Sequence, residues 1–256
     1  MNKKIYIAVI CAFSLLLTVS TGFLIKHYYD SHKQAKIYDS LAEIVDKTPD
    51  GTSEVMNYSG DKTFIPEYQE LYLENNDMVG WIKIDDTKIN YPVMQSKDNP
   101  NFYLKHGFDK KYTNYGCPYV QENCDMEQPS DNIVIYGHNM NDGSMFSALT
   151  KYKSKEFWES HKYIAFDTLI DKQNYEVIAA FKTVVYTDNA DSFKYYQFVN
   201  AETAEEFNAY IGKCKELSLY DTGLNAEYGD KLITLSTCEY SRTNGRFVVV
   251  ARLVKE

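Results

Sequence analysis

The sequence predicts a mostly β protein, a barrel or a sandwich, with N-terminal helices and one long helix inserted before the penultimate strand. Short apolar segments bounded by turn residues recur between residues 81 and 254. Such spacing is typical of barrels and sandwiches rather than parallel α/β sheets. A single segment, 201–219, has apolar residues at helical spacing instead. The expected strands are 81–84, 89–94, 133–136, 163–166, 175–185, 231–237 and 246–254.

The first 29 residues differ from the rest and are expected to form a membrane anchor. Residues 5–25 carry no charge, and Lys3 and Lys4 precede them. About 20 apolar residues in a helix cross the hydrocarbon core of a bilayer. A cleaved signal peptide is the alternative, but its apolar region usually has about 7–15 residues and ends at a small-residue site. We expect an uncleaved single-pass anchor over 1–29, with the remaining chain extracytoplasmic.

Residues 30–63 are expected to be a helical and linker segment in front of the main domain, 64–256. One amphipathic helix is predicted around residues 38–45, and a linker follows over 48–61, where Pro49 and Gly51 lie. A second short helix is predicted over 67–75, started by Pro66. For the long helix at 201–219, Asn200 is the expected N-cap.

Composition and cysteine spacing exclude some functions. The net charge of −9 argues against nucleic acid as a partner, because a phosphate-binding domain normally presents a basic face. Cys117 and Cys124 have no second pair and no matching histidines, so a metal site is not expected. A disulfide between these two cysteines outside the cell remains open. Cys214 lies on the apolar face of the predicted helix and is expected to be inert core.

Cys238 is the cysteine that structural packing explains least. The apolar strand 231–237 delivers it at its C-terminal end, where a thiol with a fixed backbone can face a groove. The alternative is that Cys238 is a small buried side chain of the core with no chemical role. A nucleophilic thiol needs a base or an ion partner, because the pKa of an ordinary cysteine is about 8.5.

His138 is the candidate partner of this thiol. It follows the apolar strand 133–136 and stands next to Gly137, which permits close approach. The other histidines outside the anchor lie in polar stretches. Two interacting groups titrate as a pair, so the resting protonation of Cys238 and His138 stays open.

Arg246 is the candidate for stabilising an oxyanion. It opens the last strand, eight positions after Cys238, so the two residues can flank one loop and converge. A guanidinium stays charged and presents a fork of donors to a developing negative charge. Arg242 in the same loop is the rival, and Arg252 lies further along the strand.

Three segments together resemble the sortases, a family of cysteine transpeptidases. They are Tyr136-Gly137-His138, the strand Thr234-Leu235-Ser236-Thr237-Cys238, and Arg246 followed by Phe-Val-Val-Val-Ala. They occur in the family's order and spacing, and the match extends over roughly residues 65–254. Residues 90–95 and 142–146, with the predicted helices, are similar to class B members. Residues 116–120 depart from the family's more usual Gly-Ser-Ile-Phe form, so the packing of that strand stays open.

The resemblance implies an eight-stranded sortase barrel and a transpeptidation that needs no cofactor or metal. It implies that Cys238 attacks after the Thr of a sorting motif, NPxTx-like or S/PPxTG-like. A cell-wall precursor amine would then take the acyl group, which anchors a surface protein to peptidoglycan. By the same carry-over His138 is the general acid and base, and Arg246 with the backbone amide of Glu239 lines the oxyanion site. Ser236, Leu104 and Asn99 match positions near the substrate groove.

Other classes of protein remain as alternatives. An L,D-transpeptidase usually has a His two residues before its Cys, whereas Thr237 and Ser236 precede Cys238. A papain-type protease would carry its Cys early and its His late. A cell-wall hydrolase would use water as the acceptor, and a non-catalytic wall-binding module would carry Cys238 as a structural residue.

Overall fold

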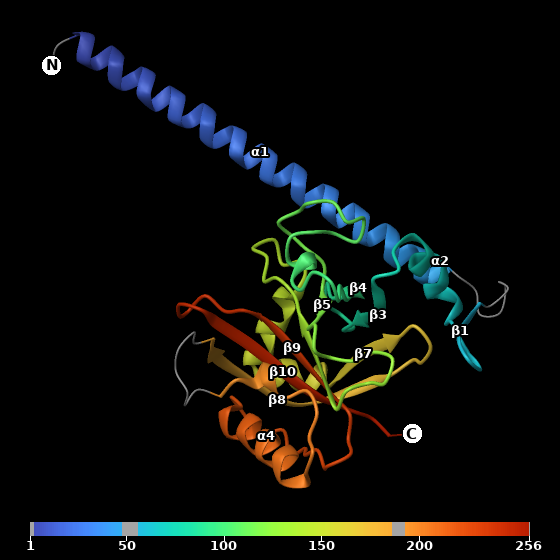
Figure 1. Ribbon diagram of the computed structural model, residues 1–256. Coiled ribbons are helices and arrows are strands. Elements are labelled where there is room, and N and C mark those ends of the chain that lie inside the picture. Colours follow the sequence, from blue (N-terminus) through green and yellow to red (C-terminus); the bar gives the residue numbers. More distant parts are fainter. Residues whose placement is uncertain (1–2, 48–55, 186–192, 256) are drawn as a thin grey trace. The chain divides into compact units, whose positions relative to one another are not determined.

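The β region closes into a barrel of eight strands. The computed structural model describes residues 3–47, 56–185 and 193–255 (Figure 1). The strand order around the barrel is β10-β8-β7-β3-β4-β5-β6-β9. The strands are β3 (Met78–Lys83), β4 (Asn90–Met94), β5 (Tyr119–Val120), β6 (Asn132–Tyr136), β7 (Tyr163–Thr168), β8 (Asn174–Val184), β9 (Leu232–Cys238) and β10 (Gly245–Leu253). The eight-stranded barrel implied by the resemblance is therefore confirmed.

The predicted strands agree with the observed ones to within a few residues, with one exception. β5 has only two residues, too few for any alternation of apolar and polar side chains to be seen. It is the strand that lies in the segment 116–120, where the sequence departs from the family form. It pairs in parallel with β4 through Met94 and Tyr119, and antiparallel with β6.

Two strand pairs in the barrel are parallel, and one of them positions the candidate site. β6 and β9 run side by side in parallel, although about 100 residues separate them in the chain. The intervening segment contains β7, β8 and α4 (Ala204–Leu217). Because parallel strands end at the same edge of a sheet, the residues that follow β6 and β9 emerge together.

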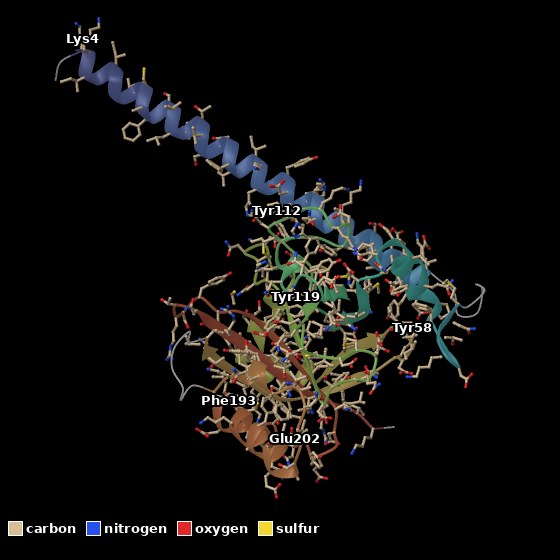
Figure 2. The ribbon with its side chains drawn as sticks, viewed as in Figure 1. Lys4, Tyr58, Tyr112, Tyr119, Phe193 and Glu202 are labelled. Atoms are coloured by element: carbon tan, nitrogen blue, oxygen red, sulfur yellow. The ribbon has the colours of Figure 1, made fainter. Side chains whose placement is uncertain are left out.

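The long helix α4 covers one side of the barrel, where Figure 1 shows it alongside β8. Its buried residues Phe207, Tyr210, Ile211 and Cys214 recur at helical spacing. They pack in one cluster with Phe181 of β8 and with residues of β9 and β10. Phe193, labelled in Figure 2, packs against this cluster with its ring tilted against that of Tyr210. This cover explains why β9 is buried along nearly its whole length.

The N-cap predicted for α4 is wrong. Thr203 caps the helix, because its hydroxyl accepts a hydrogen bond from the Glu206 N–H at 3.2 Å. The Asn200 side chain instead accepts from the Asp131 N–H at 3.0 Å. The remaining helical segments are α2 (Pro66–Glu74), α3 (Lys155–Ser160) and the 3-10 segments η1 (Phe102–Leu104), η2 (Phe146–Lys153) and η3 (Tyr195–Gln197), and a small hairpin is formed by β1 (Asn57–Ser59) and β2 (Lys62–Thr63).

The N-terminal helix α1 is one continuous element, Lys3–Lys47. It takes in both the apolar run and the separate amphipathic helix that was expected around residues 38–45. Among the described residues it is the one helix long and apolar enough to cross a membrane, a property that it shares with signal sequences. The chain divides into two compact units, Met1–Ser40 and Leu41–Glu256. Residues 48–55 of the expected linker lie outside the described residues, and the boundaries after residues 29 and 63 stay predictions.

Candidate active site

The ends of β6 and β9 bring His138 and Cys238 to the same edge of the barrel. Tyr136 of β6 is in register with Ser236 of β9. His138 and Cys238 therefore each lie two positions beyond this pair. The pairing continues past the strands. The Gly137 N–H donates to the Ser236 carbonyl at 3.1 Å, and the Thr237 hydroxyl donates to the Gly137 carbonyl at 2.7 Å.

The tight turn between β9 and β10 places Arg246 directly across from Cys238, its partner in the antiparallel register. Gly245 makes this turn feasible, because a Cβ at that position would lie 2.3 Å from the Glu239 carbonyl oxygen. One Arg246 N–H donates to the Gly245 carbonyl at 3.0 Å. Arg242 is exposed in the turn itself.

One cavity of about 540 Å³ connects these groups. His138, Cys238 and Arg246 all contribute to its wall, whereas Arg242 does not. Cys238 is half-buried rather than enclosed in apolar packing. The rest of the wall is formed by Asn101, Leu104, Tyr119, Gln121, Glu122, Asn123, Tyr136, Gly137, Val185, Tyr195, Tyr196, Gln197, Ser236 and Thr237.

The imidazole of His138 is held by the backbone of another segment. Its Nε2 lies 2.8 Å from the carbonyl oxygen of Leu104. A carbonyl only accepts, so Nε2 carries the proton and Nδ1 keeps its lone pair in the neutral ring. Burial is the largest influence and lowers the pKa of His138, and the charge of Lys105 lowers it further, against the opposing effect of the Leu104 carbonyl. The ring is therefore mainly neutral at pH 7.

The loop that carries His138 is a tight hairpin. The Phe146 N–H donates to the His138 carbonyl at 2.8 Å, and Asn139 pairs with Met145. Gly137 is required at its base, because a Cβ there would lie 2.5 Å from the ring of Phe146. The sequence feature that suggested close approach at Gly137 has this physical origin.

The comparisons with known proteins identify the family. A family model described as a sortase domain matches residues 82–254. Sortase B of Listeria monocytogenes is 36% identical over 190 residues, which cover 73% of this chain and 74% of that protein. The chain belongs to the sortase B family.

Two further matches extend along this sortase. Sortase B of Staphylococcus aureus is 29% identical over 258 residues, with 100% of this chain and 99% of that protein covered. The solved structure of a Staphylococcus aureus sortase B–substrate complex superposes with a TM-score of 0.75 at 29% identity and covers 89% of this chain and 99% of that chain. As a class B sortase, the chain is a cysteine transpeptidase of the kind that anchors surface proteins.

The expected substrate-binding residues divide into two groups in this sortase. Ser236 and Leu104 line the cavity, and the Ser236 hydroxyl shares a hydrogen bond of 2.6 Å with Tyr195. Asn99 and Glu239 do not line it. Asn101, two residues after Asn99, lines it instead.

The backbone amide of Glu239 is not placed as an oxyanion donor here. It donates to the Gly245 carbonyl at 2.9 Å and so closes the β9–β10 turn. The Glu239 side chain is also turned away from the cavity wall. It is 6% exposed, forms ion pairs with Lys153 at 3.0 Å and Lys182 at 3.2 Å, and accepts from the Ser241 N–H at 3.0 Å. These local contacts stabilise the turn, and the role of Glu239 toward the substrate that the resemblance implies stays a prediction.

The tyrosines of the cavity are the residues that sequence reasoning missed. Tyr119, Tyr136, Tyr195 and Tyr196 form much of the wall, and Tyr119, labelled in Figure 2, tilts against Tyr136 with ring centroids 5.5 Å apart. Burial raises the pKa of Tyr195 to about 12, so its hydroxyl stays protonated and acts as a donor or an acceptor. The only signal in the sequence was the general abundance of tyrosine, 23 residues, a type whose ring packs while its hydroxyl stays hydrated.

The other cysteines differ from Cys238 in their surroundings. Cys117 and Cys124 are both buried, and no disulfide joins them. Burial raises the pKa of Cys124 to about 11. Among residues 3–47, 56–185 and 193–255, no group of three or more His, Cys, Asp or Glu side chains is arranged to hold a metal ion.

Glu239→Gln is expected to reduce stability in a pH-dependent way. The Ser241 hydroxyl first, and then the two lysines, lower the pKa of Glu239 from 4.5 to about 2. A lowered carboxyl pKa stabilises the fold above about pH 4.5, and this stabilisation is lost as the pH falls toward 2. We expect the variant to lose about 2 kcal/mol of unfolding free energy at pH 7. Thermal unfolding at pH 7, 4 and 2.5 measures the difference in stability between wild type and variant, which should become smaller as the pH falls.

Glu127→Gln provides the matched control for this prediction. Glu127 pairs with Lys97 at 3.6 Å, but both side chains are mainly exposed, and such pairs contribute little. Its melting temperature should match that of the wild type at each pH. A Glu239→Gln deficit that stays constant from pH 7 to 2.5 would contradict the assignment to the ionised carboxylate.

Proposed function

We propose that Cys238 is the nucleophile of this sortase, that His138 is its general acid and base, and that Arg246 stabilises the oxyanion. The observation that supports this assignment best is the convergence of the three side chains on one cavity at the edge of the barrel. A thiol, a neutral imidazole and a guanidinium are the groups that acyl transfer needs as nucleophile, base and electrostatic partner.

The first half of the proposed reaction forms a thioacyl-enzyme. The neutral imidazole takes the proton of the Cys238 thiol, and the sulfur attacks the carbonyl carbon of Thr in the sorting motif. The oxyanion that develops lies beside Arg246. As the C–N bond breaks, His138 returns its proton to the leaving amine, which departs with the C-terminal part of the signal.

The second half transfers the acyl group to an amine. A cell-wall precursor amine attacks the thioester carbon and its proton passes to His138. As the C–S bond breaks, the imidazole returns this proton to the Cys238 sulfur, which regenerates the thiol and the neutral ring. The product is a surface protein joined to peptidoglycan through a new amide bond. Water in place of the amine would give hydrolysis, which is the alternative outcome.

The sorting motif is proposed to be NPxTx-like or S/PPxTG-like, bound along the tyrosine-rich wall. Ser236 and Leu104 lie in that wall and are proposed to contact the peptide. The existence of a solved Staphylococcus aureus sortase B–substrate complex supports substrate binding by a protein of this fold. We further propose that α1 anchors the protein in the membrane and that residues 64–256 form an extracytoplasmic catalytic domain.

A panel of fluorogenic peptides tests the proposed function. The full-length protein is incubated with NPxTx, SPxTG and PPxTG peptides and their Thr→Ala counterparts, with and without an added oligoglycine amine. We expect cleavage after Thr, a thioacyl adduct on Cys238 by mass spectrometry, and an amide product when the amine is present. Equal turnover of the Thr and Ala peptides would contradict the proposed cleavage site. If the free carboxylate is the product even when the amine is present, and no amide forms, the hydrolase is favoured.

A further inference from the structure

Asn139 connects the segment that carries His138 to the segment that carries Cys238. Its side-chain Nδ2 donates to the Cys238 carbonyl oxygen at 2.9 Å. The main-chain carbonyl of Asn139 accepts a hydrogen bond from the Tyr240 hydroxyl at 2.9 Å. One residue next to the imidazole is therefore bonded both to the residue that bears the thiol and to the second residue after it.

The backbone of Asn139 is itself fixed, so this connection is rigid. Asn139 pairs with Met145 across the hairpin, and the next residue, Met140, donates its N–H to the Ser147 hydroxyl at 2.7 Å. The Ser147 hydroxyl in turn lies within hydrogen-bond distance of the Met140 and Ser144 carbonyls, which share its single proton. A side chain held at its base in this way can hold another group in place rather than follow it.

The contact acts on the orientation of the thiol. Cys238 is the last residue of β9, and beyond it the chain enters the β9–β10 turn. Donation to the Cys238 carbonyl, together with donation of the Glu239 N–H to the Gly245 carbonyl, holds the peptide that follows Cys238 from both sides and so restrains the backbone that carries the thiol. Asn139 does not line the cavity, so its influence on the reaction must pass through its neighbours.

We infer that Asn139 is a positioning residue that sets the distance and orientation between the Cys238 thiol and the His138 imidazole. The inference rests on the proposed function, because it assigns a role toward the proposed nucleophile and base. Small displacements of reacting groups are costly, and about 1 Å of misplacement can lower a rate by roughly 100-fold. Substrate affinity does not depend on the contact, since Asn139 lies outside the cavity wall.

Two substitutions at this position separate geometry from charge. Asn139→Ser keeps a small polar side chain that is too short to reach the Cys238 carbonyl. Asn139→Asp keeps the shape but replaces the donor by a carboxylate, which cannot donate when ionised. Asn141→Asp is the matched control, because Asn141 is an exposed residue of the same loop and receives the same chemical change.

Steady-state cleavage and thiol alkylation provide the readouts with full-length protein. We expect kcat to fall roughly 10- to 100-fold in both Asn139 variants, with KM within about twofold of the wild type. The rate of Cys238 alkylation by iodoacetamide, measured as a function of pH, should change in the same two variants. Asn141→Asp should match the wild type in every measurement.

Several outcomes would overturn the inference. These are a kcat of Asn139→Ser within about twofold of the wild type, a loss that appears only in KM, and an equal loss in Asn141→Asp. A collapse of the melting temperature in Asn139→Ser would make Asn139 a structural residue instead. The Cys238→Ala variant distinguishes failure of the proposed function from failure of the inference about Asn139. If it still cleaves, the proposed function fails; if it is inactive while Asn139→Ser is fully active, only the inference fails.

Discussion

Replacing Cys238 by alanine is expected to reduce cleavage of the sorting peptide by at least about 10⁴-fold. The variant lacks the sulfur that is proposed to form the thioester, so neither the acyl-enzyme nor the amide product should appear. The side chain is small and half-buried, so the fold should be retained. Burst-phase product formation and intact-protein mass spectrometry measure the loss directly.

Cys214→Ala is the control for this substitution. Cys214 lies on the face of α4 that packs against the barrel and is fully buried, and burial raises the pKa of its thiol to about 12. A protonated, inaccessible thiol is not a nucleophile. The variant should lose some stability through the small cavity that it leaves, while its kcat/KM stays within about twofold of the wild type. Cleavage that persists in Cys238→Ala would remove the proposed mechanism.

The strand ends that carry His138 and Cys238 could be located from sequence, but their meeting could not. Each residue follows a compact apolar run, which is a local pattern. Their proximity depends on parallel pairing of β6 with β9 across about 100 residues, and no local pattern encodes such a pairing. The resemblance to a family supplied that information before the structure did. The position of Arg246 beside Cys238 can be predicted from the sequence, because a short turn forces neighbouring strands together.

The roles of Asn99 and Glu239 illustrate what the sequence could not resolve. Asn99 lies two residues from Asn101, and the irregular loop before η1 decides which of the two reaches the cavity. For Glu239, the resemblance implies that its backbone amide lines the oxyanion site. Its amide is instead occupied by the Gly245 carbonyl, a contact that only the conformation of the turn reveals. The two-residue strand β5 was missed because strands this short have no periodicity.

Arg246→Ala is expected to lower kcat/KM by roughly 100- to 1,000-fold, which corresponds to about 3–4 kcal/mol of transition-state stabilisation. Arg246 is the register partner of Cys238 and lines the same cavity, where its guanidinium can meet the charge that develops on the carbonyl oxygen. The loss should fall mainly on kcat, because that charge exists only in the transition state. Arg246→Lys should recover part of the rate, since a point charge replaces the fork of donors.

The other two arginines of the chain are controls for this charge. Arg242 is exposed in the turn and outside the cavity wall, so Arg242→Ala should leave kcat/KM within about twofold of the wild type. Arg252 lies six residues along β10 from Arg246, about 20 Å at the rise of a strand, and its guanidinium pairs with Glu176 at 3.1 Å. Its removal should affect stability rather than rate. If Arg242→Ala were as inactive as Arg246→Ala, the net positive charge of the turn, and not a positioned guanidinium, would account for the stabilisation.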